Sequence, residues 1–170
     1  MSNRRAKIGT VFIIFASAIF SGCVSVDTLL APPTPKKADG LVLNPPKNNF
    51  KEIKNSTVDQ AWQNSKNGNT IAYLSECFVK ADIPLKTIEE ENLEAMTNIE
   101  VVEDQDTTYN DREALFSTVN GKVDGVDVRL RLILFKKNSC TYTLSYVGRT
   151  KYFLVDENAF KTFVEDFKAP

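Results

Sequence analysis

Residues 115–134, LFSTVNGKVDGVDVRLRLIL, decide the fold because they contain a complete β-hairpin. Asp124-Gly125 favours a type I′ turn, in which both central residues take positive φ angles. Folding about this turn predicts an almost wholly apolar face made of the pairs Val123–Val126, Gly121–Val128, Val119–Leu130, Ser117–Leu132 and Leu115–Leu134. Because a one-residue slip would move all these side chains to the other face, the register is strongly specified.

The opposite face of this hairpin is polar near the turn and apolar at its far end. It consists of the predicted pairs Lys122–Asp127, Asn120–Arg129, Thr118–Arg131 and Phe116–Ile133. Asn120, Arg129 and Arg131 form a candidate polar binding face, since two guanidinium groups on one strand face can hold an anionic ligand. A solvated sheet face is the alternative interpretation.

Further strands are expected on both sides of the hairpin. Asn67-Gly68 predicts a second I′ turn that sets Trp62 opposite Tyr73. Residues 71–78 are apolar on both faces, which is typical of a strand that is buried on both sides. A three-residue loop at Lys137-Asn138-Ser139 would place three further side chains beside Leu134, Leu132 and Leu130, namely Tyr142, Leu144 and Tyr146.

Two amphipathic helices are predicted. The first spans roughly residues 84–97, with Asp82 as its cap, Pro84 in its first turn and an apolar face made of Leu85, Ile88, Leu93, Met96 and Ile99. The second follows Asp156 and has its apolar residues at helical spacing, at Phe160, Phe163, Val164 and Phe167. We expect the aromatic residues of the C-terminal half to be core, namely Tyr142, Tyr146, Tyr152, Phe153, Phe160, Phe163 and Phe167. The predicted fold class is α+β, an antiparallel sheet of about five to seven strands with helices packed on it.

The N-terminus has the features of a bacterial lipoprotein signal. A positively charged start precedes a mostly apolar run, residues 8–20, that is too short to cross a bilayer as a helix. The sequence Phe20-Ser21-Gly22-Cys23 then resembles the lipobox, whose cysteine is acylated. We therefore expect a signal peptide over 1–22, a lipidated proline-rich tether over 23–46 and a single domain over 47–170. Val24 resembles an outer-membrane sorting signal, which predicts a domain on the periplasmic side of that membrane.

The remaining composition limits the chemistry. The chain contains no histidine, which excludes every catalytic triad, general base or metal site that needs an imidazole. Loss of the three cations of the signal lowers the formal net charge from −1 to −4, so nucleic acid is not an expected partner. The acidic residues Glu103, Asp104, Asp106 and Asp111 do not fit a calcium-binding loop and predict a solvated loop instead. We expect no metal and no cofactor.

Two cysteines remain beside Cys23. Cys77 and Cys140 are an even pair in an oxidising compartment, which favours a disulfide. Two separate buried thiols are the alternative, because free cysteine is often a small core residue.

Several motifs between residues 71 and 167 are similar to those of known families. They are Leu74-Ser75-Glu76-Cys77, Pro84-Leu85, Asp124-Gly125-Val126-Asp127-Val128, Lys136-Lys137-Asn138-Ser139-Cys140-Thr141-Tyr142 and Phe160-Lys161-Thr162-Phe163. This pattern resembles a group of uncharacterised proteobacterial lipoproteins and, more distantly, the PsbP-like domains of photosystem II extrinsic proteins. The second resemblance implies an α/β/α sandwich and a non-catalytic accessory role in a membrane complex.

These observations lead to three hypotheses about function. The first is a membrane-tethered, non-catalytic binding module for a protein complex of the cell envelope. The second is a carrier or sensor of a small apolar or lipidic ligand held between helix and sheet. An enzyme that uses carboxylates has the least support, because no pair of acids is seen to converge in the sequence.

Overall fold

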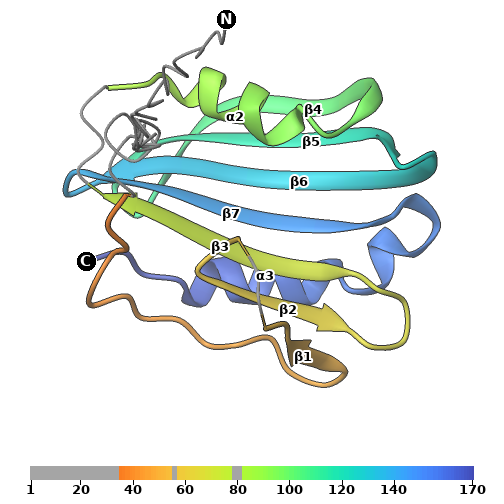
Figure 1. Cartoon of the computed structure of the whole chain (residues 1–170). Helices are drawn as coiled ribbons and strands as arrows, with labels where there is room; N and C mark the ends of the chain where they lie inside the picture. The colour runs from red at the N-terminus through yellow and green to blue at the C-terminus, as the bar shows by residue number, and fades with distance from the viewer. Residues whose placement is uncertain (1–34, 55–56, 78–81) are drawn as a thin grey trace, which may run out of the picture. The chain divides into compact units, whose positions relative to one another are not determined.

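In the computed structural model, the described residues are 35–54, 57–77 and 82–170; the expected signal, Cys23 and Phe78 lie outside them. These residues form one antiparallel sheet in the order β1-β2-β3-β7-β6-β5-β4 (Figure 1). Its strands are β1 (Phe50–Glu52), β2 (Gln60–Asn64), β3 (Thr70–Cys77), β4 (Thr97–Tyr109), β5 (Arg112–Val123), β6 (Val126–Lys137) and β7 (Cys140–Arg149). The helices are α2 (Leu85–Leu93), the 3₁₀ helix η1 (Thr150–Val155) and α3 (Glu157–Asp166).

The β5–β6 hairpin forms as predicted. Every expected pair is present, from Val123 opposite Val126 to Leu115 opposite Leu134. Asp124 and Gly125 have φ angles of 50° and 78°, the values that a type I′ turn requires. The predicted fold class is confirmed with it, because the other strands add to this hairpin in antiparallel order.

The β6–β7 hairpin has a different register from the predicted one. Asn138 and Ser139 both take positive φ, so the turn has two central residues and Lys137 pairs with Cys140. Tyr142 therefore lies opposite Phe135, and Leu144 and Tyr146 follow it on the same face. The prediction that these three extend the Leu134 face was wrong, because the shift by one residue moves them to the other side of the sheet.

The β2–β3 hairpin also departs from the predicted register. Among its turn residues only Gly68 has positive φ, and the backbone amide of Asn64 donates to the carbonyl of Asn69 across a wider loop. Trp62 consequently pairs with Ile71, whereas Tyr73 pairs with Gln60. The rings of Trp62 and Tyr73 still stack diagonally, with their centroids 6.4 Å apart.

The sheet separates two hydrophobic clusters, and one helix covers each (Figure 1). On one face α3 packs onto the aromatic cluster, which comprises Trp62, Tyr73, Phe135, Tyr142, Tyr146, Phe153, Phe160, Phe163 and Phe167 among others. On the opposite face α2 packs onto the aliphatic cluster of β5 and β6, which includes Val119, Leu130, Leu132 and Leu134. Of the aromatic residues expected in the core, Tyr152 is the exception, with 37% of its surface exposed.

The predicted helix over residues 84–97 is too long at its C-terminal end. Helix α2 ends at Leu93, and Ile99 lies in β4 with 44% of its surface exposed. Asp82 does not cap the helix; its carboxylate pairs with Lys136 instead. Glu89, which is not part of the predicted apolar face, is buried and forms an ion pair with Lys86 at 2.5 Å.

Strand β4 was not predicted from the sequence. Glu103, Asp104 and Asp106 belong to this strand and not to a loop, although they are solvated as expected. β4 pairs with β5 along its length and has irregularities between Thr97 and Glu100 and between Val101 and Glu103. It forms one outer edge of the sheet, and β1 forms the other.

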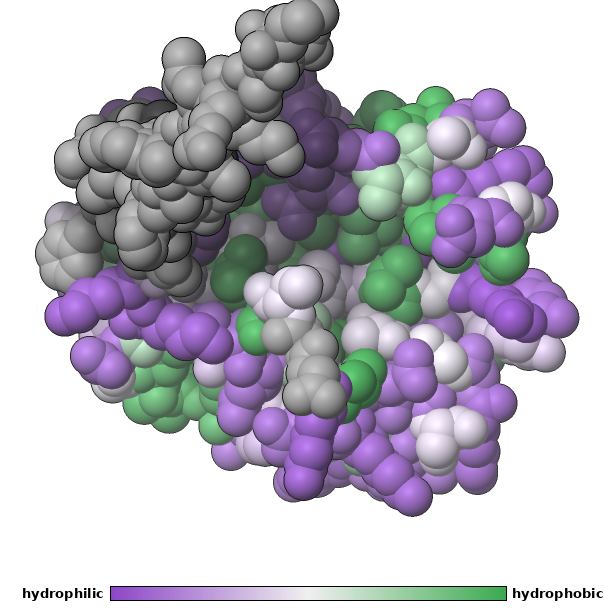
Figure 2. All heavy atoms as spheres, in the orientation of Figure 1, coloured by the Kyte–Doolittle hydropathy of each residue, from purple (hydrophilic) through white to green (hydrophobic). Residues whose placement is uncertain are grey.

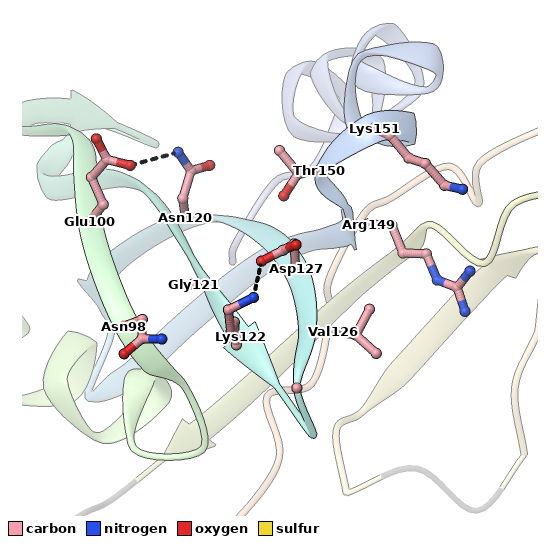
Figure 3. Close-up of a pocket in the computed structure, with 11 residues that line it drawn as sticks. Asn98, Glu100, Asn120, Gly121, Lys122, Val126, Asp127, Arg149, Thr150 and Lys151 are labelled. Atoms are coloured by element: carbon pink, nitrogen blue, oxygen red, sulfur yellow. Dashed lines mark hydrogen bonds and ion pairs between the residues drawn. The ribbon is translucent and has the colours of Figure 1, made fainter.

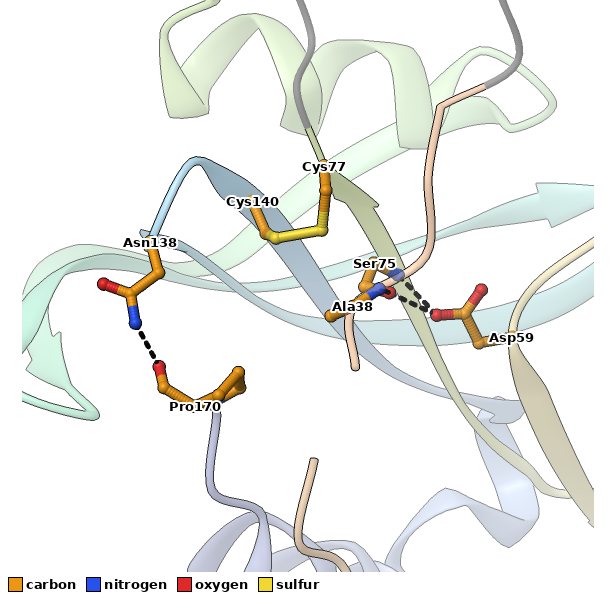
Figure 4. Close-up of a disulfide and its surroundings, with 7 residues drawn as sticks. All are labelled: Ala38, Asp59, Ser75, Cys77, Asn138, Cys140 and Pro170. Carbon is orange, nitrogen blue, oxygen red and sulfur yellow. Dashed lines mark hydrogen bonds between the residues drawn. A yellow bond between two sulfur atoms is a disulfide. The ribbon is translucent and has the colours of Figure 1, made fainter. Parts of the chain in front are cut away.

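The disulfide joins Cys77 and Cys140, which are partners in the β3–β7 register (Figure 4). At this end of the sheet the chain of residues 35–46, assigned to the tether from the sequence, already contacts the domain. Lys36 forms a β-bridge with Cys77, and the amide of Ala38 donates to the Ser75 hydroxyl at 2.9 Å. Contacts with the domain thus begin well before residue 47.

Candidate functional site

A groove of about 840 Å³ lies at the end of the sheet that carries the β5–β6 turn (Figure 3). Strands β4, β5, β6 and β7 and the start of η1 each contribute to it. Its lining residues are mainly polar or charged: Asn98, Glu100, Asn120, Gly121, Lys122, Gly125, Val126, Asp127, Arg149, Thr150 and Lys151. The Asp124-Gly125 turn positions this wall, because it fixes which side chains of the hairpin point to the α3 side.

Within the groove one lysine has an acidic partner, whereas two other cations have none. Lys122 pairs with Asp127 at 2.6 Å, and the Asn120 amide donates to Glu100 at 3.4 Å. Arg149 and Lys151 are exposed, and neither forms an ion pair with an acid among the described residues. Unpaired cations beside a polar groove favour an acidic ligand or partner segment.

Exposed apolar side chains follow these cations along the chain and also occur at the β5–β6 turn. In η1 Leu154 and Val155 each expose 68% of their surface, and Val126 at the neighbouring β5–β6 turn exposes 42%. Together with Tyr152, these residues are called the η1 tip. Figure 2 shows green hydrophobic atoms among purple hydrophilic ones at this end of the molecule. Apolar side chains surrounded by polar ones are typical of protein contact surfaces.

A buried hydrogen-bond network holds η1 in place. The side-chain amide of Asn69, fully buried, lies 2.9 Å from the carbonyl oxygen of Tyr152 and 2.8 Å from the Asp156 carboxylate. The Tyr146 hydroxyl donates to the Phe153 carbonyl at 2.5 Å. Burial, together with the nearby negative charge of Asp156, raises the pKa of Tyr146 above its ordinary range, so this hydroxyl keeps its proton. The tip is therefore presented by a fixed backbone.

Asp156 precedes α3 as expected, but its side chain does not cap the helix. The carboxylate accepts hydrogen bonds from the amides of Asn64, Asn67 and Asn69. It thereby joins the β2–β3 loop to the start of α3, which stabilises the same end of the sheet.

The predicted polar face divides between two surroundings. Asn120 lines the groove and accepts a hydrogen bond from the Arg129 Nε at 2.8 Å. Arg131 instead donates to Thr118 and forms an ion pair with Glu157 at 2.6 Å. Both guanidinium groups lie 5.5 Å from the centre of the Phe153 ring.

Arg131 thus supports the η1–α3 connection. The hydrogen bond from its guanidinium is the main reason that the pKa of the Glu157 carboxyl is lowered. With its charge neutralised in this way, Arg131 is poorly placed to clasp a free anion.

The fold has known counterparts. No protein-family model matches the chain, and neither does any curated protein sequence. Among solved structures it is similar to CyanoP, the cyanobacterial PsbP of Synechocystis sp. PCC 6803, with 10% identity, a TM-score of 0.51 and coverage of 83% of this chain and 95% of that one. The fold is PsbP-like.

Two further solved structures are similar to the chain. One is LpqN, involved in cell envelope biogenesis of Mycobacterium tuberculosis, with 11% identity, a TM-score of 0.55 and coverage of 76% and 83% of the two chains. The other is PA94 of Pseudomonas aeruginosa, described as a protein of unknown function and regulator candidate, with 12% identity, a TM-score of 0.46 and coverage of 77% and 83%. At these identities the likeness concerns the fold alone.

Two features are absent from the described part of the PsbP-like domain. None of its helices has the length and apolar sequence needed to cross a bilayer. In residues 35–54, 57–77 and 82–170, no three acidic or cysteine side chains come together as metal ligands.

Sequence reasoning missed the cations and the tip. Arg149 ends β7, and Lys151, Leu154 and Val155 belong to η1, for which the sequence predicts no function. A signal was present: the stretch 149–155, RTKYFLV, has neither the alternation of a strand nor the spacing of an amphipathic helix, yet combines two cations with four large apolar residues.

Proposed function

We propose that this protein is a membrane-tethered accessory module that binds a partner protein of the cell envelope through the groove and the η1 tip. The observation that carries the proposal is the combination of unpaired Arg149 and Lys151 with the exposed apolar residues Leu154 and Val155 on one fixed segment. Such a surface suits an acidic partner segment with apolar side chains, because charge steers the encounter and apolar burial stabilises the complex.

The position of this surface fits a tethered module. Residue 36 joins the sheet at Cys77, beside the β6–β7 turn, whereas the β5–β6 turn and η1 lie at the opposite end (Figure 1). Strand β6 has 12 residues, and at about 3.3 Å per residue the two ends are separated by roughly 40 Å. A chain that is held at the membrane by its N-terminal segment can therefore present the groove away from its attachment.

The membrane attachment is part of the proposal and depends on the lipobox-like sequence that ends at Cys23. Acyl chains on this cysteine would anchor the domain, and Val24 favours the outer membrane with the domain in the periplasm. The test is metabolic labelling with an alkyne palmitate analogue. We expect label in the wild-type protein and none in Cys23→Ser; absence of label from the wild type, or equal label in both, would contradict the anchor.

The groove itself favours a protein partner over an enclosed lipidic ligand. It is open to solvent and its walls carry charges, as Lys122, Asp127, Arg149 and Lys151 in Figure 3 illustrate. A carrier of apolar molecules would need a dry apolar cavity, because charged walls disfavour a hydrocarbon ligand.

Charge reversal tests the partner-binding surface. We expect Arg149→Glu combined with Lys151→Glu to abolish quantitative co-purification of a cross-linked envelope protein from detergent-solubilised membranes. The matched control is Lys51→Glu with Lys54→Glu, which changes the net charge equally at exposed positions outside the groove. Equal recovery of the same partner from the two double variants would contradict the assignment of this surface.

A further inference from the structure

The outer edge of the sheet at β4 is a second surface, separate from the groove's cations and the η1 tip. All residues from Thr97 to Thr108 are exposed, and the strand has 13 residues, against three for β1 at the other edge. A long edge strand presents a row of unpaired backbone amides and carbonyls that can accept another strand. From Glu103 to Tyr109 the pairing with β5 is regular, so this part of the edge is suited to strand addition.

A hollow of about 350 Å³ lies beside this regular part, between α2 and β4. Leu85 and Leu115 provide apolar surface, and Asp104 and Asp106 provide carboxylates. Both acids lie on the α2 side of the sheet, since their register partners are Ser117 and Leu115. An added strand would place alternate side chains toward the same side.

The charges in this hollow are unbalanced. Asp104 forms an ion pair with Lys86 at 2.6 Å, and Lys86 also contacts Glu89. These two acids raise the pKa of Lys86, which stays charged. Asp106 forms no ion pair with a described cation, and neither does Glu103 on the other face of the strand. The hollow thus combines the apolar surface of Leu85 and Leu115 with excess negative charge, which matches the alkyl stem and charged head of lysine or arginine.

The same charges argue against a second copy of this chain as the occupant. Antiparallel pairing of two β4 edges centred on Asp106 would set the two Asp106 side chains opposite each other. A pairing centred on Gln105 sets Asp104 of each copy opposite Asp106 of the other instead. Like charges that face each other across strands destabilise the pair.

We propose that residues 103–109 of β4 bind an extended segment of another protein by strand addition. One lysine or arginine side chain is directed to Asp106, and a second, two residues away, to Asp104, whose single cation Lys86 is shared with Glu89. Backbone hydrogen bonds along the edge stabilise the complex, and the acidic hollow selects the basic side chains. This site is independent of the proposed partner surface at the η1 tip.

The test uses short synthetic peptides in which lysine alternates with valine, added to the full chain without its signal. Amide hydrogen exchange and chemical shifts of residues 103–109 report strand addition. We expect saturable protection of these amides, and affinity reduced about tenfold or more in Asp104→Asn combined with Asp106→Asn. Glu90→Gln with Glu91→Gln is the matched control: it removes the same charge from exposed positions of α2 and should leave affinity unchanged.

Three outcomes would overturn the proposal. One is the absence of binding, or binding that leaves the β4 amides unprotected. Another is equal binding of a peptide with the same composition but with its lysines clustered, because attraction by charge alone needs no strand. The third is concentration-dependent protection of β4 without peptide, which would identify a second copy as the occupant.

Discussion

Gly148 in β7 is the position at which a single methyl group should do most damage to the candidate site. A Cβ there would lie 2.0 Å from the Asn69 Oδ1 and 2.8 Å from its Cγ, far inside van der Waals contact. Asn69 is fully buried and its amide nitrogen contacts Tyr146, Tyr152 and Asp156. Gly148→Ala must therefore displace the side chain that holds η1.

The expected loss in the free energy of unfolding has two contributions. Overpacking of a buried site costs about 1–3 kcal/mol. Displacement of Asn69 disrupts at least two hydrogen bonds, at about 1 kcal/mol each. We expect Gly148→Ala to lower the free energy of unfolding by about 3–5 kcal/mol, a large part of the stability of an ordinary domain.

Urea unfolding followed by the fluorescence of Trp62, the chain's single tryptophan and a buried one, measures this change. A double-mutant cycle with Asn69→Ala separates the clash from other effects of the methyl group. In that background the atoms nearest to the new Cβ are gone, so Gly148→Ala should cost less than about 1 kcal/mol. An equal cost in both backgrounds, or a negligible one in the wild type, would refute the reasoning.

Three further predictions concern the rest of the domain. Leu134→Ala, at a fully buried position, should lower the urea-unfolding free energy by about 2–5 kcal/mol, and a loss below 1 kcal/mol would argue against the assigned β5–β6 core. Replacing Cys77 and Cys140 by serine should cost about 4 kcal/mol for a separation of 63 residues, and reductant should then no longer affect the unfolding midpoint, as it does for the wild type. Glu157→Gln should cost about 1–2 kcal/mol at neutral pH through the loss of its charged pair with Arg131. Because the folded pKa of Glu157 is lowered from 4.5, this difference should persist above that value and vanish as the pH falls through the folded pKa; a difference independent of pH would exclude the ion pair as its cause.

The β5–β6 hairpin could be predicted from the sequence because two independent signals agree there. Asp124-Gly125 fixes the turn type, and the apolar alternation on both sides fixes the register. The β6–β7 register could not, since Asn138-Ser139 lacks the glycine that marks a two-residue turn, although both residues take positive φ. The strand after it alternates tyrosine and leucine with threonine and serine, so its pattern alone does not say which face meets which helix.

Strand β4 could not be predicted from the sequence for a related reason. It is exposed along nearly its whole length, so no buried face imposes alternation on its side chains. Its acids were therefore interpreted as a loop, whereas pairing with β5 makes them part of the sheet edge.

Part of the candidate site could be predicted from the sequence. The predicted register of the β5–β6 hairpin correctly places Arg129 opposite Asn120. The ion pair between Arg131 and Glu157 depends on how α3 packs against the sheet. No local sequence pattern predicts this packing. Arg149 and Lys151 line the groove because η1 lies beside the β5–β6 turn, an arrangement that the sequence did not predict.

Site-specific photo-cross-linking in cells that naturally produce the protein tests the central claim most directly. A photoreactive amino acid at Leu154, on the η1 tip, should form one discrete adduct with an envelope protein, and the same probe at Lys51 should form none. Charge reversal of Arg149 and Lys151 should remove the Leu154 adduct. Identical adducts from both probe positions, or no adduct from Leu154, would contradict the claim that this end of the sheet binds a partner.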